Sequence, residues 1–144
     1  MKHKDLIEQA AGLVRPYQTT SGRLFGDVAA VVISSTGNRY VGVCVDTPSW
    51  GLCAERSAMA AMIAHSEYRL RKLVAVWRNH QTGQLHVLPP CGVCREFMRQ
   101  VDEGNLDAEI VLDGERTKTL RELIPECEWP GPVAKGRRWS DAVT

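Results

Sequence analysis

Apolar residues recur along the chain with two patterns, one typical of helices and one typical of buried strands. Apolar positions at intervals of three and four predict amphipathic helices, and Pro16 ends the first of them. Continuous apolar runs, rich in β-branched residues, predict buried strands. The expected helices cover residues 4–14, about 52–65, about 91–101 and 119–124. The expected strands cover 28–33, 40–45, 73–77 and 108–112, with a short extended stretch at 85–88.

The order of these elements predicts an α/β domain with a mixed sheet and helices on its faces. The turn at 34–38 is too short for a crossover, so the first two strands are expected to pair antiparallel. Asp5 is a candidate cap for the first helix, and Pro89-Pro90 blocks helix formation just before the third. The chain shows no internal repeat and no linker, which predicts a single domain over 1–144. Its last part, about 125–144, is expected to be an irregular tail.

Composition narrows the functional classes. The chain has 144 residues, with 18 Lys and Arg against 17 Asp and Glu, so its net charge is +1. Proteins that wrap nucleic acid need a strong basic excess, so this balance argues against a nucleic-acid partner. No apolar run approaches the ~18 residues of a membrane helix, and the first residues do not resemble a signal peptide. We therefore expect a cytoplasmic protein without a membrane partner. In that reducing compartment the five cysteines are expected to be metal ligands, nucleophiles or buried thiols.

Two cysteine motifs open predicted helices. Cys53-Ala54-Glu55 begins the second helix, and Pro90-Cys91-Gly92-Val93-Cys94 begins the third. Helix N-termini favour thiolates, and cysteines at i and i+3 face one way. Three thiolates at one point predict a Zn²⁺ site, and three protein ligands are typical of catalytic zinc. A fourth ligand from Cys44 or Cys127 would instead predict a structural zinc module.

The two residues after Ala54 extend this chemistry. Zinc makes its bound water acidic near neutral pH, and Glu55 could accept a proton from that water. Three thiolates carry more negative charge than one Zn²⁺ neutralises. Arg56 could offset the excess by donating hydrogen bonds to the thiolates.

These motifs resemble those of the cytidine deaminase superfamily, whose zinc enzymes carry H-or-C-x-E followed by P-C-x-x-C. The likeness runs from Val28 to about Pro132 and includes Leu120-Arg121-Glu122-Leu123-Ile124-Pro125, which is similar to a C-terminal motif of the free-nucleoside branch. The resemblance implies a three-layer α/β/α fold with a mixed sheet, and zinc held by Cys53, Cys91 and Cys94. It implies an enzyme that deaminates a cytosine nucleoside hydrolytically to the uracil analogue and ammonia, with Glu55 carrying the protons.

The resemblance also bears on substrate size and assembly. The first zinc ligand is His in most nucleic-acid editors of the superfamily, so Cys53 favours a small-molecule nucleoside, as in pyrimidine salvage. The all-cysteine branch forms homotetramers, and by analogy we expect a homotetramer here.

The sequence departs from the family at the sugar-binding motif. Cytidine deaminases carry N-x-E after the second strand, and its side chains hold the ribose 3′-hydroxyl. The matching residues are Cys44-Val45-Asp46. Asp46 could replace the glutamate with a shorter reach, whereas Cys44 cannot make the hydrogen bonds of an asparagine. The loop before Cys53 is shorter than usual, and in length it is closer to that of blasticidin S deaminase. Arg56, however, is the residue that cytidine deaminases carry at its position.

A modified cytosine nucleoside is therefore one expected substrate. The alternatives are a blasticidin S-type deaminase and a deaminase of another amino-substituted heterocycle. The non-enzyme alternatives are a structural zinc module and a protein that binds nucleosides without turnover. Trp50 could stack on the substrate or fill an interface, and the Trp129 motif resembles an aromatic-Gly-Pro tail that can close a neighbouring site. Phe25 and Asp27 could contact the base or the sugar, and they are equally well explained as a core aromatic and a turn residue. The candidate substrate-binding residues are Phe25, Asp27, Cys44, Asp46, Trp50, Ala54 and Trp129.

Overall fold

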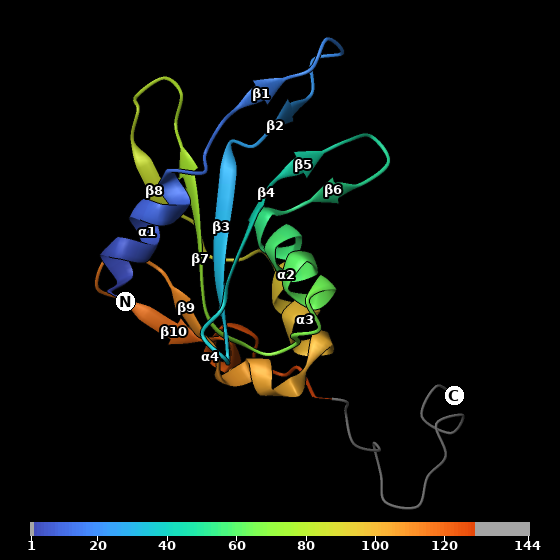
Figure 1. Cartoon of the computed structure of the whole chain (residues 1–144), viewed down its shortest axis with the longest axis vertical. Coiled ribbons are helices and arrows are strands. Elements are labelled where there is room, and N and C mark those ends of the chain that lie inside the picture. The colour runs from blue at the N-terminus through green and yellow to red at the C-terminus, as the bar shows by residue number, and fades with distance from the viewer. Residues whose placement is uncertain (1, 129–144) are drawn as a thin grey trace, which may run out of the picture.

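A mixed sheet forms the middle of the protein in a computed structural model that describes residues 2–128 (Figure 1). The strands lie in the order β10-β9-β7-β3-β4, and β8 also pairs with β7. Only β7 and β9 run parallel, whereas the other pairings of this sheet are antiparallel. The strands are β3 (Val28–Ser34), β4 (Arg39–Val43), β7 (Leu70–Arg78), β8 (Leu85–Val87), β9 (Glu109–Val111) and β10 (Thr117–Thr119).

Helices cover both faces of the sheet, because successive side chains of its buried strands point to opposite faces. On one face, Leu6 and Ala10 of α1 (His3–Ala11) pack against a cluster that includes Val31 and Val74. On the other face, Ala30 and the buried side chains of α2 (Ala54–Ala64) and α3 (Gly92–Val101) form the larger core cluster. The 3₁₀ helix η1 (Glu103–Asp107) and α4 (Leu120–Leu123) adjoin that layer. The expected three-layer α/β/α fold with a mixed sheet is confirmed.

The structure differs from the sequence-based expectation mainly in its shortest strands. Two ribbons of two-residue strands stand at one end of the sheet, where the sequence predicted turns and a loop (Figure 1). Strands of two residues are too short to show a hydrophobic period in the sequence. The edge strand β10 is polar, so it shows no such period either. The two ribbons are β1 (Tyr17–Gln18) with β2 (Leu24–Phe25), and β5 (Val45–Asp46) with β6 (Gly51–Leu52).

The start of α1 also differs. Lys2 is the N-cap residue, and Asp5 lies three positions later, where its carboxylate accepts a 3.3 Å hydrogen bond from the Lys2 backbone N–H. The expectation that Asp5 caps this helix was therefore wrong in position, although its side chain does satisfy a backbone donor near the N-terminus. Among residues 2–128, no helix combines the length and the hydropathy that crossing a bilayer requires.

Gly42 brings α2 against the sheet. A Cβ atom at this position would lie 2.3 Å from the backbone nitrogen of Ala58 and 2.7 Å from the carbonyl oxygen of Ala54. Only a residue without a side chain allows β4 and the first turns of α2 to approach this closely. The glycine therefore sets the position of the N-terminal end of α2.

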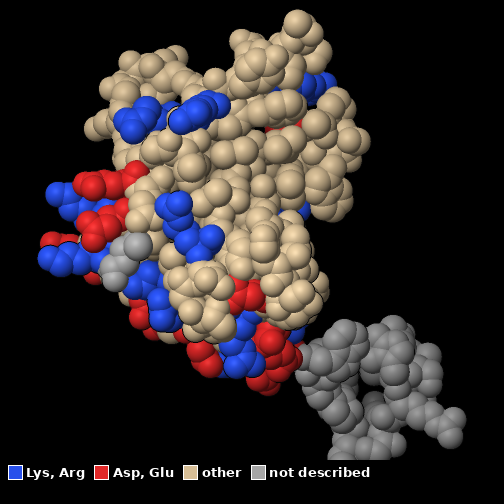
Figure 2. Space-filling model, in the orientation of Figure 1, with Lys and Arg blue, Asp and Glu red and all other residues tan. Residues whose placement is uncertain are grey.

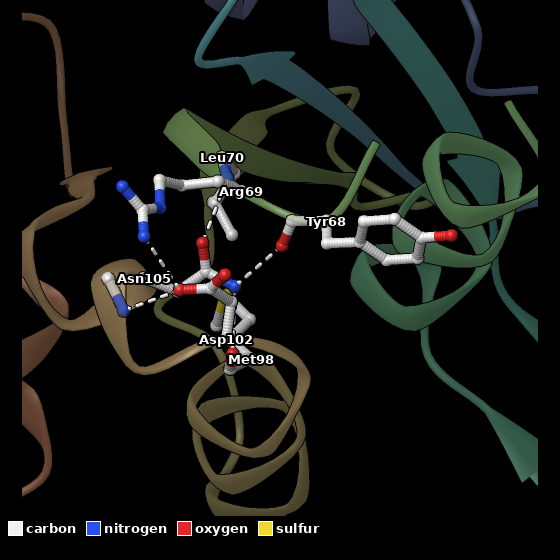
Figure 3. A network of polar contacts seen from close by, with 7 residues as sticks. Tyr68, Arg69, Leu70, Met98, Asp102 and Asn105 are labelled. Atoms are coloured by element: carbon white, nitrogen blue, oxygen red, sulfur yellow. Dashed lines mark hydrogen bonds and ion pairs between the residues drawn. The ribbon is translucent and has the colours of Figure 1, made fainter. Parts of the chain in front are cut away.

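Asn105 joins three segments near the C-terminal end of α3 (Figure 3). Its buried side-chain oxygen accepts a hydrogen bond from the Leu70 backbone N–H at 2.9 Å. Its amide nitrogen donates to the carbonyl oxygens of Tyr68, at 3.1 Å, and Met98, at 2.9 Å. One side chain thus connects η1, the start of β7 and the last turns of α3, and so holds α3 against the sheet.

Candidate metal centre

Three cysteine side chains meet where the N-termini of α2 and α3 converge. Cys53 is the N-cap residue of α2, Cys91 is the N-cap residue of α3, and Cys94 lies within the first turn of α3. Their sulfur atoms all lie within 4.8 Å of one another. Within residues 2–128, no other group of three or more His, Cys, Asp or Glu side chains could hold a metal ion. The sulfur atoms of Cys44 and Cys127 are not part of the group, so the geometry gives no support to a four-cysteine site.

The spacing of these sulfurs fits zinc. A tetrahedral ion with Zn–S bonds of about 2.3 Å keeps its sulfur ligands roughly 3.8 Å apart. The Sγ atoms of Cys53 and Cys91 are 3.7 Å apart. Three soft sulfur donors within 4.8 Å of one another match a zinc site, and residues 2–128 place no fourth cysteine, histidine or carboxylate ligand among them.

Glu55 lies beside this group in the first turn of α2 and is only 5% exposed. The Cys94 thiol donates to its Oε2 atom at 3.9 Å. Burial raises the pKa of Glu55, because a buried carboxylate loses hydration. A carboxyl group with a raised pKa in contact with a metal-ligand set is suited to accept and return protons near neutral pH.

The pKa values of Cys91 and Cys94 are shifted in opposite directions. Burial and the nearby Glu55 charge raise the pKa of Cys94. Burial acts in the same direction on Cys91, yet the backbone N–H groups and neighbouring thiols outweigh it and lower the pKa of that residue. The backbone N–H groups at the start of α3 thus prevail at Cys91, whereas burial and the Glu55 charge prevail at Cys94. A bound cation favours the thiolate form of its ligands and so opposes the effect of burial.

Arg56 adds positive charge to the same group. Its Nη2 atom donates to the carbonyl oxygen of Gly51 at 3.0 Å and to the sulfur of Cys53 at 3.6 Å. Burial works against its charge, but the contacts with Cys53 and Cys94 prevail and raise the pKa of Arg56. The guanidinium carbon also lies 5.7 Å from the centre of the Trp50 ring, within cation–π range.

The candidate substrate-binding residues fall into two places. Phe25, Asp27, Cys44 and Asp46 lie on or beside the two ribbons, at the end of the sheet where α2 begins (Figure 1). The β5–β6 pairing places Val45 opposite Leu52, and Cys44 and Cys53 are the chain neighbours of these two residues at the base of the ribbon. These residues therefore approach the metal centre from the ribbon side.

The other candidates lie in different surroundings or outside the described residues. Trp50 is 64% exposed and lines an apolar groove of about 610 Å³ between α2 and α3. The side chain of Ala54 is fully buried, and Trp129 lies outside the described residues. The apolar groove is lined by Trp50, Leu52, Arg56, Ala60, Gly92, Val93, Glu96, Phe97 and Gln100.

Sequence reasoning missed residues that hold the site together. Arg95 donates to the carbonyl oxygens of Pro90 and Leu123, both at 2.7 Å, and so fixes the segment before α3 and the end of α4. A glycine inside a predicted strand was the available sign of the close approach at Gly42. Nothing in the local sequence marks Asn105, because its partners are backbone groups distant in the chain.

Comparison with known proteins agrees with this geometry. No protein-family model matches the chain. The cytidine deaminase of Salmonella paratyphi B is 34% identical over 109 residues, which cover 72% of this chain and 33% of that protein. The chain thus spans about a third of the length of the curated relatives that it matches.

Solved structures match over nearly their whole length. The cytidine deaminase of Burkholderia pseudomallei superposes with a TM-score of 0.67 at 26% identity, covering 88% of this chain and 98% of that one. The enzyme of Mycobacterium tuberculosis gives a TM-score of 0.68 at 25% identity, covering 88% and 96%. The fold and the site together define an α/β protein with a three-cysteine zinc centre at two helix N-termini. By sequence and by structure, the protein is a homologue of the cytidine deaminases, which confirms the resemblance of its motifs.

Proposed function

We propose that this protein catalyses the zinc-dependent hydrolytic deamination of a cytosine nucleoside to its uracil analogue, with release of ammonia. The observation that carries the proposal is the buried Glu55 carboxyl group beside a group of three, and not four, cysteine sulfurs. The homology with cytidine deaminases supports the same reaction.

Each residue of the centre has a distinct task in this reaction. Cys53, Cys91 and Cys94 hold the zinc ion, which supplies Lewis-acid activation of water. Glu55 accepts one proton from the attacking water and delivers it to the ring nitrogen. It then accepts the second proton from the hydroxyl group of the adduct and transfers it to the amino group, which leaves as ammonia. Arg56 donates to Cys53 and offsets the negative charge of the thiolates.

The substrate is proposed to be a small molecule, because a net charge of +1 is too small to attract the phosphate backbone of a nucleic acid. A modified cytosine nucleoside or a blasticidin S-type compound is favoured over cytidine by one observation. Cys44 stands in the sugar-binding motif and donates its thiol to Asp27 instead of offering the two-sided hydrogen bonding of an amide.

A homotetramer in the cytoplasm completes the proposal. The apolar groove exposes Trp50 and Val93. Figure 2 shows charged side chains gathered mainly along the left edge and the bottom of the molecule, with fewer on the right, where β5, β6 and the start of α2 lie. An apolar, charge-poor face of this kind suits contact between copies of the chain. All five cysteines are unpaired, as expected in a reducing compartment.

A substrate panel tests the function. Zinc-loaded protein is incubated with cytidine, deoxycytidine, 5-substituted cytidines and blasticidin S, and ultraviolet absorbance and ammonia are followed. We expect ammonia release from at least one of them, and none from Glu55→Gln with its zinc content unchanged. Silence across the panel from protein that holds zinc excludes a cytosine substrate and favours another amino-substituted heterocycle. Turnover by Glu55→Gln refutes the assigned role of Glu55.

A further inference from the structure

The carboxylate of Asp27 has unused acceptor positions, and only Cys44 lies between it and the metal centre. The Cys44 thiol donates to the Oδ1 atom of Asp27 at 2.8 Å. Cys44 in turn precedes Val45, which pairs with Leu52, the residue before Cys53, so the two cysteines adjoin the same pair at the base of the β5–β6 ribbon. Side chains at opposite positions of paired strands have Cβ atoms about 5 Å apart. Asp27 therefore lies within the length of a nucleoside from the zinc-binding sulfurs.

The orientation of this carboxylate is fixed by Cys44. The Cys44 sulfur accepts a hydrogen bond from the Val28 backbone N–H at 3.4 Å, so its own hydrogen is left for Asp27. Burial and the hydrogen bond to Asp27 raise the pKa of Cys44, which keeps the thiol protonated and able to donate. One oxygen of Asp27 is thereby engaged and the other is left for a ligand.

The backbone around Asp27 is held on both sides. Gly26 donates to the Cys44 carbonyl oxygen at 3.0 Å, and Cys44 donates to the Val28 carbonyl oxygen at 3.0 Å. Gly26 has a φ of +74°, and a Cβ atom there would lie 2.6 Å from the Arg15 carbonyl oxygen. The segment therefore needs a glycine, and its backbone hydrogen bonds hold Asp27 in place before a ligand binds, which lowers the cost of ordering it.

The charge of Asp27 is not neutralised by another residue. Among residues 2–128, the Cys44 thiol is its only hydrogen-bond partner, and none of the ion pairs includes it. A carboxylate accepts hydrogen bonds at both oxygens and donates none when ionised. Such a group favours a hydroxyl donor and repels a phosphate.

We propose that Asp27, oriented by Cys44, is a specificity-determining residue that accepts a hydrogen bond from one sugar hydroxyl of the nucleoside. This inference rests on the proposed function. The amino group of cytosine must lie at the metal centre to react, and the sugar leaves the ring from the opposite side, at N1. The far side of Cys44 from Cys53 is where that sugar would lie.

The test compares affinities, so that it does not depend on turnover. Zinc-loaded Glu55→Gln protein, with and without Asp27→Asn, is titrated with cytidine and its 2′-, 3′- and 5′-deoxy analogues in a calorimeter. The amide that Asp27→Asn introduces keeps an oxygen for Cys44 but presents an NH₂ group to the ligand. We expect cytidine to bind about tenfold to a hundredfold more weakly, as for a hydrogen bond to a charged group. For one deoxy analogue alone, Asp27→Asn should leave the affinity unchanged, because that analogue lacks the hydroxyl that would donate to Asp27.

Control variants separate recognition from folding. Asp107→Asn makes the same change in an exposed ion pair of η1, and should leave every affinity unchanged. Cys44→Ser keeps a donor for Asp27 and should retain the pattern, whereas Cys44→Ala should weaken binding of the same ligands as Asp27→Asn. Equal weakening of all four ligands, or no weakening, overturns the inference.

The outcomes also distinguish this inference from the proposed function. If the predicted affinity pattern appears but wild-type protein releases no ammonia from the substrate panel, the function fails and the role of Asp27 stands. If wild-type protein deaminates cytidine and Asp27→Asn binds all four ligands as before, the function stands and the role of Asp27 fails. If none of the four ligands binds, the role of Asp27 is refuted, whereas the proposed function is decided by the substrate panel.

Discussion

Replacing Asn105 with alanine should destabilise the protein severely, although this residue lies outside the metal centre. The substitution removes three buried hydrogen bonds, to the backbone groups of Leu70, Tyr68 and Met98 (Figure 3). Each bond contributes about 1 kcal/mol net, and each buried group left without a partner costs about 1–3 kcal/mol. Water that enters the vacated space can satisfy some of these groups. We therefore expect the free energy of unfolding to fall by roughly 3–5 kcal/mol.

Urea unfolding followed by circular dichroism measures this change, with wild type and variant at equal free zinc, because a ligand that binds only the folded state adds stability. Asn79→Ala is the matched control. Asn79 accepts from the backbone N–H groups of Gln81 and Thr82 in an exposed turn, so its loss should cost less than about 1 kcal/mol. Asn105→Asp keeps the acceptor for Leu70 but loses both donors, and should be as destabilising as Asn105→Ala at neutral pH. A loss below about 1 kcal/mol for Asn105→Ala would refute the reasoning.

Three further predictions follow from the structure. Gly42→Ala places a methyl group in the space of the α2 backbone, so stability should fall by about 1–3 kcal/mol in thermal or urea unfolding. The hydroxyl groups of Thr36 and Tyr40 lower the pKa of Glu67 from 4.5 to about 2. The folded state therefore gains stability above the unfolded pKa and loses it as the pH falls from about 4.5 to 2, and Glu67→Gln should abolish this loss in urea midpoints measured across that range. Cys91→Ala should lose zinc, by metal analysis, together with stability, since metal binding and folding are coupled.

Each of these predictions has a control at a position without the relevant contact. A Cβ atom at Gly114 would meet no other atom within 4 Å, so Gly114→Ala should leave stability almost unchanged, and an equal loss at both glycines would contradict the argument. Glu115→Gln, in an exposed turn, should keep the wild-type dependence on acid. Cys127→Ser should retain zinc, and a loss of zinc comparable with that of Cys91→Ala would show that the ligand set is misassigned.

The longer elements could be predicted because their signals are local. The apolar run that became β3 and the helical spacing in α2 each extend over enough residues for a period to be visible. The ribbons β1–β2 and β5–β6 could not, since each strand has two residues and its pairing depends on a partner across a turn. β10 is polar and joins the sheet only because β9 offers it an open edge.

By itself, the sequence determined the kind of chemistry: two cysteine motifs at helix starts, with a glutamate two residues after the first, are enough to predict zinc and a proton carrier. Only the tertiary structure decided which side chains surround that centre. It separated Cys44 and Cys127 from the sulfur group, turned the Cys44 thiol toward Asp27, and placed Trp50 in the apolar groove. The physical reason is the difference in sequence separation between the residues that interact. Helix spacing acts over a few residues and is written in the local sequence, whereas these contacts join segments that meet only when the sheet and its helices have packed together.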